Sequence, residues 1–505
     1  MNIRALQLGS NDLSRRYRIC PDAEWHYEPK LSREDREYDI AVIDRKLTDE
    51  EADILSRIVR AYCLFVTERT EMTDRMDFLM ISRCGRRIGD DELRRLLEEE
   101  LPDYYGRPYG EKFDPHMLTA APGFHGSISW HGFTEMVMEG RFGEQMRQAA
   151  FWRTNIPVEK GQAIDHLWLE YEKNPGVTIE LEVTQFVSGS VAAVQKVWKF
   201  SEDELQHQVT IENTEKDGPV FVAVNARGSG TLKIIALHDR YSRHGEGTFL
   251  PGGRRLVTED REELFTYLDP GDLKPPLCVY FSGYKTQEGF EGYRMMRRTG
   301  CPFLLISDAR LEGGGFYIGS PAYEELVSSA VRDAMKELGF TEEQVIFSGL
   351  SMGTFGALYY ATGIRPAYII VGKPLVRLGQ VAEAERIDRP DGFPTSLDVL
   401  WKEMRSLDHE AAERMNRKFW EKFDNTDWSG RTFYIAYMIE DDYDAGAYQE
   451  LLTHMRGRGA SVIGEGLTGR HNDNTSGIVS WFIRQYRHVI RDGFDRKQAQ
   501  DGGTE

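Results

Sequence analysis

The feature that most constrains the fold of this chain is a serine between two glycines, at the point where an apolar run is followed by a helix-forming run. Residues 345–347 have the length and composition of a buried strand, and residues 353–361 favour a helix. Gly349 and Gly353 flank Ser351 at two residues' distance, which lets neighbouring backbone pass closely at a sharp turn. The pentapeptide alone is a weak signal. With the strand and helix around it, it predicts a nucleophilic hydroxyl projecting over the edge of a sheet.

Apolar runs of strand length recur along the last half of the chain, and helix-forming stretches separate several of them. The runs are 277–281, 303–306, 345–347, 368–371, 433–438 and 461–464. The helical stretches are 323–338, 353–361, 448–456 and 478–490. This alternation predicts a doubly wound, mostly parallel sheet over residues 260–492, and with the serine motif it predicts an α/β-hydrolase-type catalytic domain.

Two further regions precede this domain, because 505 residues are too many for one ordinary domain. Residues 1–125 contain short apolar runs and a capping box, Thr48 with Glu51, which predict a small α/β unit. Residues 150–256 contain many short runs that alternate apolar and polar residues, which predict a β-sandwich. This sandwich is a candidate for binding a glycan or a partner through Trp168 or Trp198, although tryptophans are more often core residues.

A serine nucleophile needs a general base, and in this fold the chain order is serine, acid, histidine. His409, His454, His471 and His488 follow Ser351. Two of them, His454 and His488, fall within helical stretches, and His409 precedes every plausible acid. His471 follows the last strand candidate and comes just before the last helical stretch. The sequence therefore predicts His471 as the base.

The acid is expected just after the apolar run 433–438, where several carboxylates follow one another. They are Glu440, Asp441, Asp442 and Asp444. The residue types alone leave the choice open. The usual loop length after the strand favours Asp441, with Asp442 next and Glu440 as a further alternative. The acid would hold the tautomer of His471 and stabilise its imidazolium form.

Backbone amides should stabilise the negative charge that develops during acyl transfer. The amide of Met352 is the expected first donor, because it lies at the start of the helix after Ser351. The second donor should come from the loop after an earlier strand, and the backbone at Gly283 and Tyr284 ends such a strand.

A charged group, Asp308, Arg310 and Glu312, also follows a strand candidate. The sequence leaves open whether it faces the site or forms a structural salt bridge. We find no metal-binding or nucleotide-binding motif, so we expect no metal and no tightly bound cofactor.

The net charge of −19 gives the chain no bulk attraction to nucleic acid or anionic lipid. The five cysteines are scattered without a Cys-x-x-Cys pair, which predicts free thiols in a reducing compartment. No apolar stretch has the length of a signal peptide core or a membrane span. We therefore expect a cytoplasmic protein that binds no nucleic acid and reaches a membrane only through a partner.

Three long segments carry a resemblance to a known family. They are FSGYKTQEGFEGY at 281–293, RLEGGGFY at 310–317 and GLSMGTFGALYY at 349–360, joined by LQLG at 6–9 and ALHDR at 236–240. The chain resembles the accessory Sec-system proteins that O-acetylate glycans on serine-rich-repeat adhesins of Gram-positive bacteria, over most of its length. The segments around Gly283 and Ser351 are far more specific than the pentapeptide.

The resemblance implies an acetyltransferase that modifies N-acetylglucosamine on the adhesin before export. It implies Ser351 as nucleophile, His471 as base and Asp441 as acid. The sequence does not identify the acetyl donor, for which acetyl-CoA is the first candidate. The resemblance also implies a complex with two sister accessory secretory proteins and contact with the accessory translocase. The export role of the family does not require catalysis, so one chain can have two functions.

Two alternatives remain beside the acetyltransferase. A carbohydrate esterase or another serine hydrolase would use the same three residues, and the difference is whether the site excludes water until a sugar hydroxyl attacks. A non-catalytic assembly module of the export complex would keep the fold with a decayed site. The intact serine motif and the position of His471 speak against complete decay.

Overall fold

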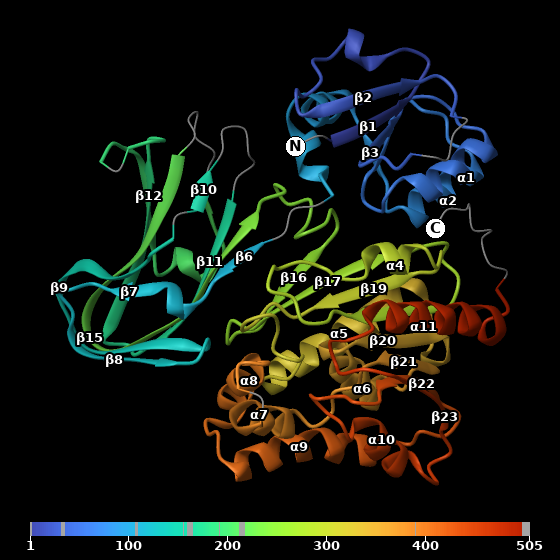
Figure 1. Ribbon diagram of the computed structural model, residues 1–505. Helices are drawn as coiled ribbons and strands as arrows, with labels where there is room; N and C mark the ends of the chain where they lie inside the picture. The colour runs from blue at the N-terminus through green and yellow to red at the C-terminus, as the bar shows by residue number, and fades with distance from the viewer. Residues whose placement is uncertain are drawn as a thin grey trace.

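The structure is a computed structural model, and it describes residues 3–31, 36–106, 110–154, 156–158, 165–190, 192–211, 218–388 and 390–496. Its strands form three separate sheets, one in each region of the chain (Figure 1). In Figure 1 the N-terminal region is blue, the middle region is cyan to green, and the C-terminal region is yellow to red. Fold class is thus α/β with a β-rich middle, as predicted.

The N-terminal sheet has five parallel strands in the order β2-β1-β3-β4-β5. Its strands are β1 (Ile3–Leu8), β2 (Ala23–Glu28), β3 (Ile40–Ile43), β4 (Leu64–Thr67) and β5 (Arg86–Ile88). Its helices are α1 (Asp49–Ile58), α2 (Asp74–Ser82) and α3 (Asp90–Arg95). The predicted capping box is confirmed, because Thr48 and Glu51 satisfy each other's backbone amides at the start of α1.

The middle sheet is antiparallel throughout and is larger than its predicted range. Its strands are β6 (Glu111–Phe113), β7 (Leu118–Ala120), β8 (His125–His131), β9 (Glu135–Trp152), β10 (Ile156–Val158), β11 (Asp165–Lys173), β12 (Val177–Phe186), β13 (Val194–Ser201), β14 (Val209–Ile211) and β15 (Gly218–Tyr241). It begins well before residue 150. Register shifts near Gly140, Gly143 and Gly228 break the alternation of apolar and polar residues, so β9 and β15 do not look like single strands in the sequence.

The strands of this region form one connected sheet instead of two separate ones. The first half of β15 pairs with β12, its second half pairs with β11, and β9 pairs along both halves. The predicted alternation along β12 is confirmed, with Val177, Ile179 and Leu181 buried. Trp168 is a core residue, 1% exposed and covered by two arginines, so it offers no surface for a glycan.

The C-terminal sheet has the strand order β16-β17-β19-β18-β20-β21-β22-β23, parallel from β19 to β23. This is the order of the α/β-hydrolase fold. The strands are β16 (Arg254–Val257), β17 (Glu263–Asp269), β18 (Leu277–Phe281), β19 (Phe303–Ser307), β20 (Val345–Leu350), β21 (Tyr368–Gly372), β22 (Thr432–Met438) and β23 (Ser461–Leu467). The helices are α4 (Tyr293–Arg297), α5 (Pro321–Leu338), α6 (Met352–Ile364), α7 (Leu378–Ile387), α8 (Thr395–Met404), α9 (His409–Asp424), α10 (Ala447–Met455) and α11 (Thr475–His488).

Helices cover both faces of this sheet and create two cores (Figure 1). Leu277, Val279 and Phe281 of β18 face the core under α5, α6, α7, α9 and α10. Cys278 and Tyr280 of the same strand face the core under α4 and α11. Strands buried on both faces explain the continuous apolar runs in the sequence. Among the described residues, no helix combines the length and apolarity that crossing a membrane requires.

A buried ionic cluster joins the middle sheet to the C-terminal sheet. Arg240 of β15 contacts both carboxylate oxygens of Glu263 of β17, at 2.7 Å each, and also pairs with Glu288. His238 of β15 lies between Glu288 and Glu170 of β11. Burial opposes ionisation of the carboxylates, but Arg240 overcomes it and lowers the pKa of Glu263 to about 2.

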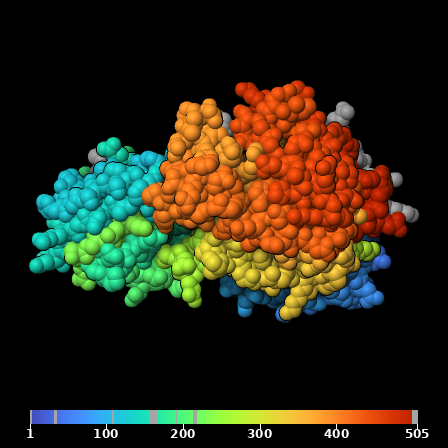
Figure 2. All heavy atoms as spheres, turned by 90° about the horizontal axis from the view of Figure 1, so that it is seen from below, coloured from blue at the N-terminus to red at the C-terminus, as the bar shows by residue number. Residues whose placement is uncertain are grey.

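A second contact joins the turn between β8 and β9 to α8. The carboxylate of Asp398 accepts hydrogen bonds from the Phe133 amide, at 2.9 Å, and from the Thr134 hydroxyl, at 3.3 Å. Burial raises the pKa of Asp398 to about 7. Figure 2 shows this side of the molecule, with the orange segment that contains α8 against the cyan part of the middle sheet.

We expect Arg240→Met to destabilise the protein by about 3–5 kcal/mol, because it removes the guanidinium that pairs with two buried carboxylates, those of Glu263 and Glu288. Arg332→Met is the matched control, since Arg332 pairs with Glu325 on the exposed face of α5 and should change the melting temperature little. Thermal unfolding measures both variants. Equal melting temperatures would show that the cluster does not hold the two sheets together.

The same cluster predicts a pH dependence of stability. The pKa of Glu263 lies near 2 in the folded protein and near 4.5 without its partners, so its ionised form stabilises the fold above about pH 4.5. This contribution should disappear as the pH falls from 4.5 toward 2. Melting temperatures recorded across this range should fall more steeply for the wild type than for Glu263→Gln.

Candidate active site

Ser351 occupies a strained turn between β20 and α6. Its backbone has φ 51° and ψ −120°, a left-handed conformation that side chains rarely adopt. A Cβ at Gly349 would lie 2.3 Å from the Gly353 carbonyl oxygen, and a Cβ at Gly353 would lie 2.1 Å from the Phe281 carbonyl oxygen. Both glycines are therefore required for close approach of backbone, as the sequence pattern suggests.

Ser351, His471 and Asp441 form a continuous line of hydrogen bonds. The Oγ atom of Ser351 lies 2.8 Å from Nε2 of His471, and Nδ1 of His471 lies 2.9 Å from Oδ2 of Asp441. His471 is 1% exposed, and Asp441 is buried as well. With the proton on Nδ1, the ring donates to Asp441 and Nε2 accepts from the serine hydroxyl. The ring can then take the serine proton.

The sequence did not decide which of the neighbouring carboxylates is the acid, and the structure distinguishes them by their partners. Asp441 contacts the ring of His471, whereas Asp442 accepts from the backbone amide of His471, at 3.1 Å, and Glu440 accepts from the amide of Gly469. The second oxygen of Asp441 accepts from two amides of its own loop, at 2.8 and 3.0 Å. Burial opposes its ionisation, but these bonds and the His471 ring lower the pKa of Asp441.

The other histidines after Ser351 are paired elsewhere. His409 contacts Glu383, His454 stacks on Trp420 and contacts Asp424, and His488 contacts Asp492. None of these partners is Ser351.

The loop after β18 lies alongside the serine turn, but its amides have different roles. Gly283 N–H donates to Oε2 of Glu291, at 2.5 Å, so the structure does not leave this predicted donor free. Tyr284 N–H donates to no group within the described residues, and Met352 N–H begins α6, where amides have no helical acceptor. Met352 and Tyr284 are therefore the amides available for an oxyanion.

The glycine-rich loop after β19 packs against the side chains of the same two residues, Tyr284 and Met352. A Cβ at Gly313 would lie 2.2 Å from the ring of Tyr284, and a Cβ at Gly314 would lie 2.5 Å from the side chain of Met352. Both positions have positive φ, 79° and 125°. Glycine is thus needed there for space and for backbone conformation.

The charged residues after β19 have two different roles: some form a structural salt bridge, and one faces the site. Arg310 and Asp308 form a buried salt bridge, at 2.8 Å, and Arg310 also pairs with Glu262. Glu312 instead is half-buried and faces the hydroxyl of Tyr284. Asp308 and Arg310 therefore support the loop, and only Glu312 borders the candidate site.

Sequence reasoning missed Tyr443 and Glu291. The ring of Tyr443 stacks on that of His471, with centroids 4.4 Å apart and an interplanar angle of 1°. This contact fixes the plane of the imidazole. Glu291 holds the loop of Gly283, as described above. Neither residue has a local motif, and their roles depend on loops that only the fold brings together.

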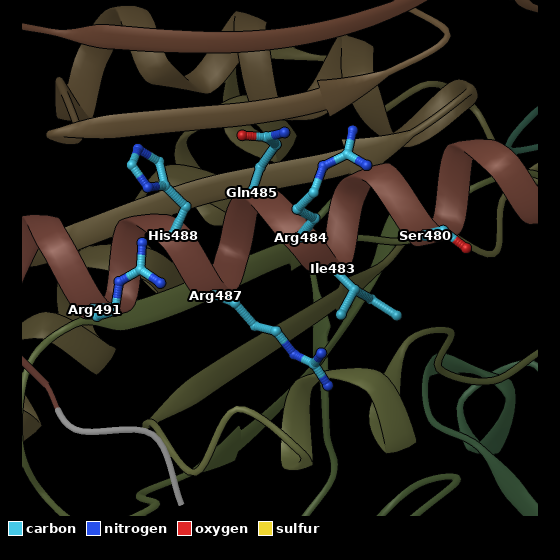
Figure 3. Close-up of a pocket in the computed structure, with 7 residues that line it drawn as sticks. All are labelled: Ser480, Ile483, Arg484, Gln485, Arg487, His488 and Arg491. Atoms are coloured by element: carbon cyan, nitrogen blue, oxygen red, sulfur yellow. The ribbon is translucent and has the colours of Figure 1, made fainter. Parts of the chain in front are cut away.

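One depression on the described surface is separate from this site. It has a volume of about 830 Å³ and lies along α11 and the turn after it, lined by Ser480, Ile483, Arg484, Gln485, Arg487, His488 and Arg491 (Figure 3). It is open and basic, and Ser351, Asp441 and His471 do not line it. We therefore place the chemistry at Ser351.

One group outside the site has the donor atoms of a metal centre. Glu170, His238 and Glu263 bring one possible ligand atom each within 4.8 Å of one another. Both oxygens of Glu263 already contact Arg240, and a cation there would face that guanidinium at close range. The group therefore fits the ionic cluster between the sheets better than a metal site.

A family model described as an accessory Sec system GspB-transporter matches residues 3–496. The chain belongs to this accessory Sec system family. The family includes an accessory Sec system protein of Streptococcus gordonii, 35% identical over 509 residues, which cover 98% of this chain and 99% of that protein. A protein of the same name from Staphylococcus aureus is 35% identical over 516 residues, 98% of each chain.

The family membership extends to a solved structure. A chain of the Glycosylation Associate Protein (Gap123) complex from Streptococcus agalactiae matches with a TM-score of 0.85 and 34% identity. The match covers 98% of this chain and 99% of that one. The arrangement of all three sheets is therefore shared with that chain.

We predict that Asp441→Asn lowers the rate of acetyl-ester hydrolysis by about 10⁴, because an amide no longer holds the imidazolium and its tautomer. Glu440→Gln and Asp442→Asn should each lower the rate much less, since both contact backbone amides. A chromogenic acetyl ester measures all three. If Asp442→Asn had the largest effect, the assignment of Asp441 would be wrong.

Proposed function

We propose that this protein is a serine-dependent O-acetyltransferase within the accessory Sec system. The observation that carries the proposal is the line from Ser351 through His471 to Asp441, with the amides of Met352 and Tyr284 beside the serine. Serine, histidine and a carboxylate in this geometry perform acyl transfer on unrelated folds. Decay of a site through lack of use would not preserve a strained serine turn together with its base and acid.

The chemistry follows from these positions. Nε2 of His471 takes the proton of Ser351 while Oγ attacks the acetyl carbonyl, and the amides of Met352 and Tyr284 stabilise the oxyanion. Collapse of the tetrahedral intermediate expels the leaving group, which receives the proton from His471. An acceptor hydroxyl then gives its proton to His471 and attacks the acetyl-serine. The product is an O-acetyl ester, and the serine regains its proton.

We propose acetyl-CoA as the acetyl donor and N-acetylglucosamine on a serine-rich-repeat glycoprotein as the acceptor. We also propose that the protein assembles with two sister accessory secretory proteins and contacts the accessory translocase from the cytoplasmic side. The relative in the Gap123 complex supports the assembly, because that protein is named as part of a complex and matches this chain over nearly its full length.

Hydrolysis of an acetyl ester is the second candidate function. The same atoms serve it, with water in place of the sugar hydroxyl as the second nucleophile. Ser351 is half-buried, so water reaches the site in the absence of an acceptor. A third possibility, a purely structural role in the export complex, uses the same surfaces without the chemistry.

In cells that export the adhesin, Ser351→Ala should remove acetyl groups from its glycan while export continues. Mass measurement of the glycan tests acetylation, and the amount of exported adhesin tests transport. Unchanged acetylation would exclude Ser351 as the nucleophile. If the variant lost both acetylation and export, the two functions would depend on each other, contrary to our proposal.

With purified protein, His471→Ala should abolish hydrolysis of a chromogenic acetyl ester, because no other histidine in the described part of the chain contacts Ser351. His454→Ala is the matched control, since its ring stacks on Trp420 at 3.9 Å and pairs with Asp424. Its rate should equal that of the wild type. Equal losses in both variants would indicate a general effect on folding and would remove the support for His471 as base.

A further inference from the structure

The side chain of Tyr284 is exposed although its loop lies beside the serine turn. It is 40% exposed, which is unusual for a large aromatic residue in the described structure. Its backbone loop runs along the serine turn, where a Cβ on the neighbouring Gly283 would lie 3.2 Å from the Leu350 carbonyl oxygen. The proposed mechanism uses only the amide of Tyr284. The ring has no role in it.

Contacts on several sides fix this ring in place. One part rests on Gly313, where a Cβ would collide with three ring atoms at 2.2 to 2.7 Å. The ring of Phe393 packs against it edge to face, with centroids 5.4 Å apart. Its hydroxyl faces Glu312 and Thr395, and the hydroxyl of Thr395 donates to the Glu312 carbonyl oxygen, at 2.8 Å.

The aromatic contacts continue from Tyr284 to the base. Phe393 stacks on Tyr443, with centroids 5.5 Å apart, and Tyr443 stacks on His471. A ligand on the exposed part of the Tyr284 ring is therefore placed at one end of a rigid wall whose other end is the imidazole. A rigid, exposed aromatic ring binds a ligand with little loss of conformational entropy.

The charges beside the ring indicate the kind of ligand. Glu312 is a carboxylate at the ring's hydroxyl, and Asp442 is exposed next to Tyr443. Carboxylates accept hydrogen bonds from hydroxyl groups and repel anions. A flat aromatic surface suits the apolar face of a sugar ring. A neutral pyranose with free hydroxyls satisfies both conditions.

We propose that the ring of Tyr284, with Glu312 at its edge, is the acceptor subsite that positions a pyranose for attack on the acetyl-serine. This assignment rests on the proposed acetyltransferase function and adds the residues that select the acceptor. The amide of Tyr284 serves the acetyl group, and its side chain serves the sugar. Retention of sugar at this position also explains how transfer competes with water.

Direct binding tests the subsite without any chemistry. The probe is methyl N-acetyl-D-glucosaminide, and ligand-observed NMR measures its binding to Ser351→Ala protein. Adding Tyr284→Ala or Tyr284→Leu should weaken binding about tenfold, whereas adding Tyr284→Phe, which keeps the ring, should weaken it about twofold. Adding Trp130→Ala is the matched control, because Trp130 is 44% exposed but lies on β8, and binding should not change.

Transfer kinetics, measured with the wild-type serine at position 351, separate the acceptor subsite from the acetyltransferase function. Tyr284→Leu should raise the KM for the glucosaminide about tenfold and lower the ratio of transfer to hydrolysis by a similar factor. Equal binding and an unchanged KM in Tyr284→Ala and Tyr284→Leu would overturn the subsite, even if acetyl transfer itself is observed. If binding depends on Tyr284 but no transfer to sugar occurs, the acetyltransferase function fails and the sugar site stands.

Discussion

The left-handed backbone of Ser351 is the constraint on which the catalytic domain depends. The conformation exists because β20 ends and α6 begins within one residue, and it requires glycines on both sides. Packing on both faces of the sheet stabilises the domain and offsets the energetic cost of this strained backbone. The turn also brings the start of α6 next to the loop of Tyr284, so one strained residue places the proposed nucleophile near the amides that we propose for the oxyanion.

The histidine is held by neighbours of three different kinds. Asp441 binds one ring nitrogen, Asp442 binds the backbone amide, and Tyr443 covers the face of the ring. These are consecutive residues of one loop, the loop after β22. This one loop therefore orients the imidazole, and a change in its backbone conformation would affect all three contacts at once. Its conformation is as important for the chemistry as the identity of the acid.

The sequence contained enough information to select Ser351 and His471, because a local motif and chain order restrict each choice. It did not decide which carboxylate is the acid. Glu440, Asp441 and Asp442 are adjacent in the chain and differ only in the group that each contacts in the fold. The sequence also assigned Gly283 and Tyr284 equal roles, because the fold alone brings Glu291 to the amide of Gly283. The extent of the middle sheet was underestimated for a related reason, as bulges conceal the period of β9 and β15.

The cluster around Arg240 bears on how this architecture arose. Arg240 and His238 come from the middle sheet, whereas Glu263 and Glu288 come from the C-terminal region. An exchange of the middle region for an unrelated module would take Arg240 and His238 away from Glu288 and would leave Glu263 with Arg255 alone. Any replacement for the middle region would therefore have to supply a cation at the same place.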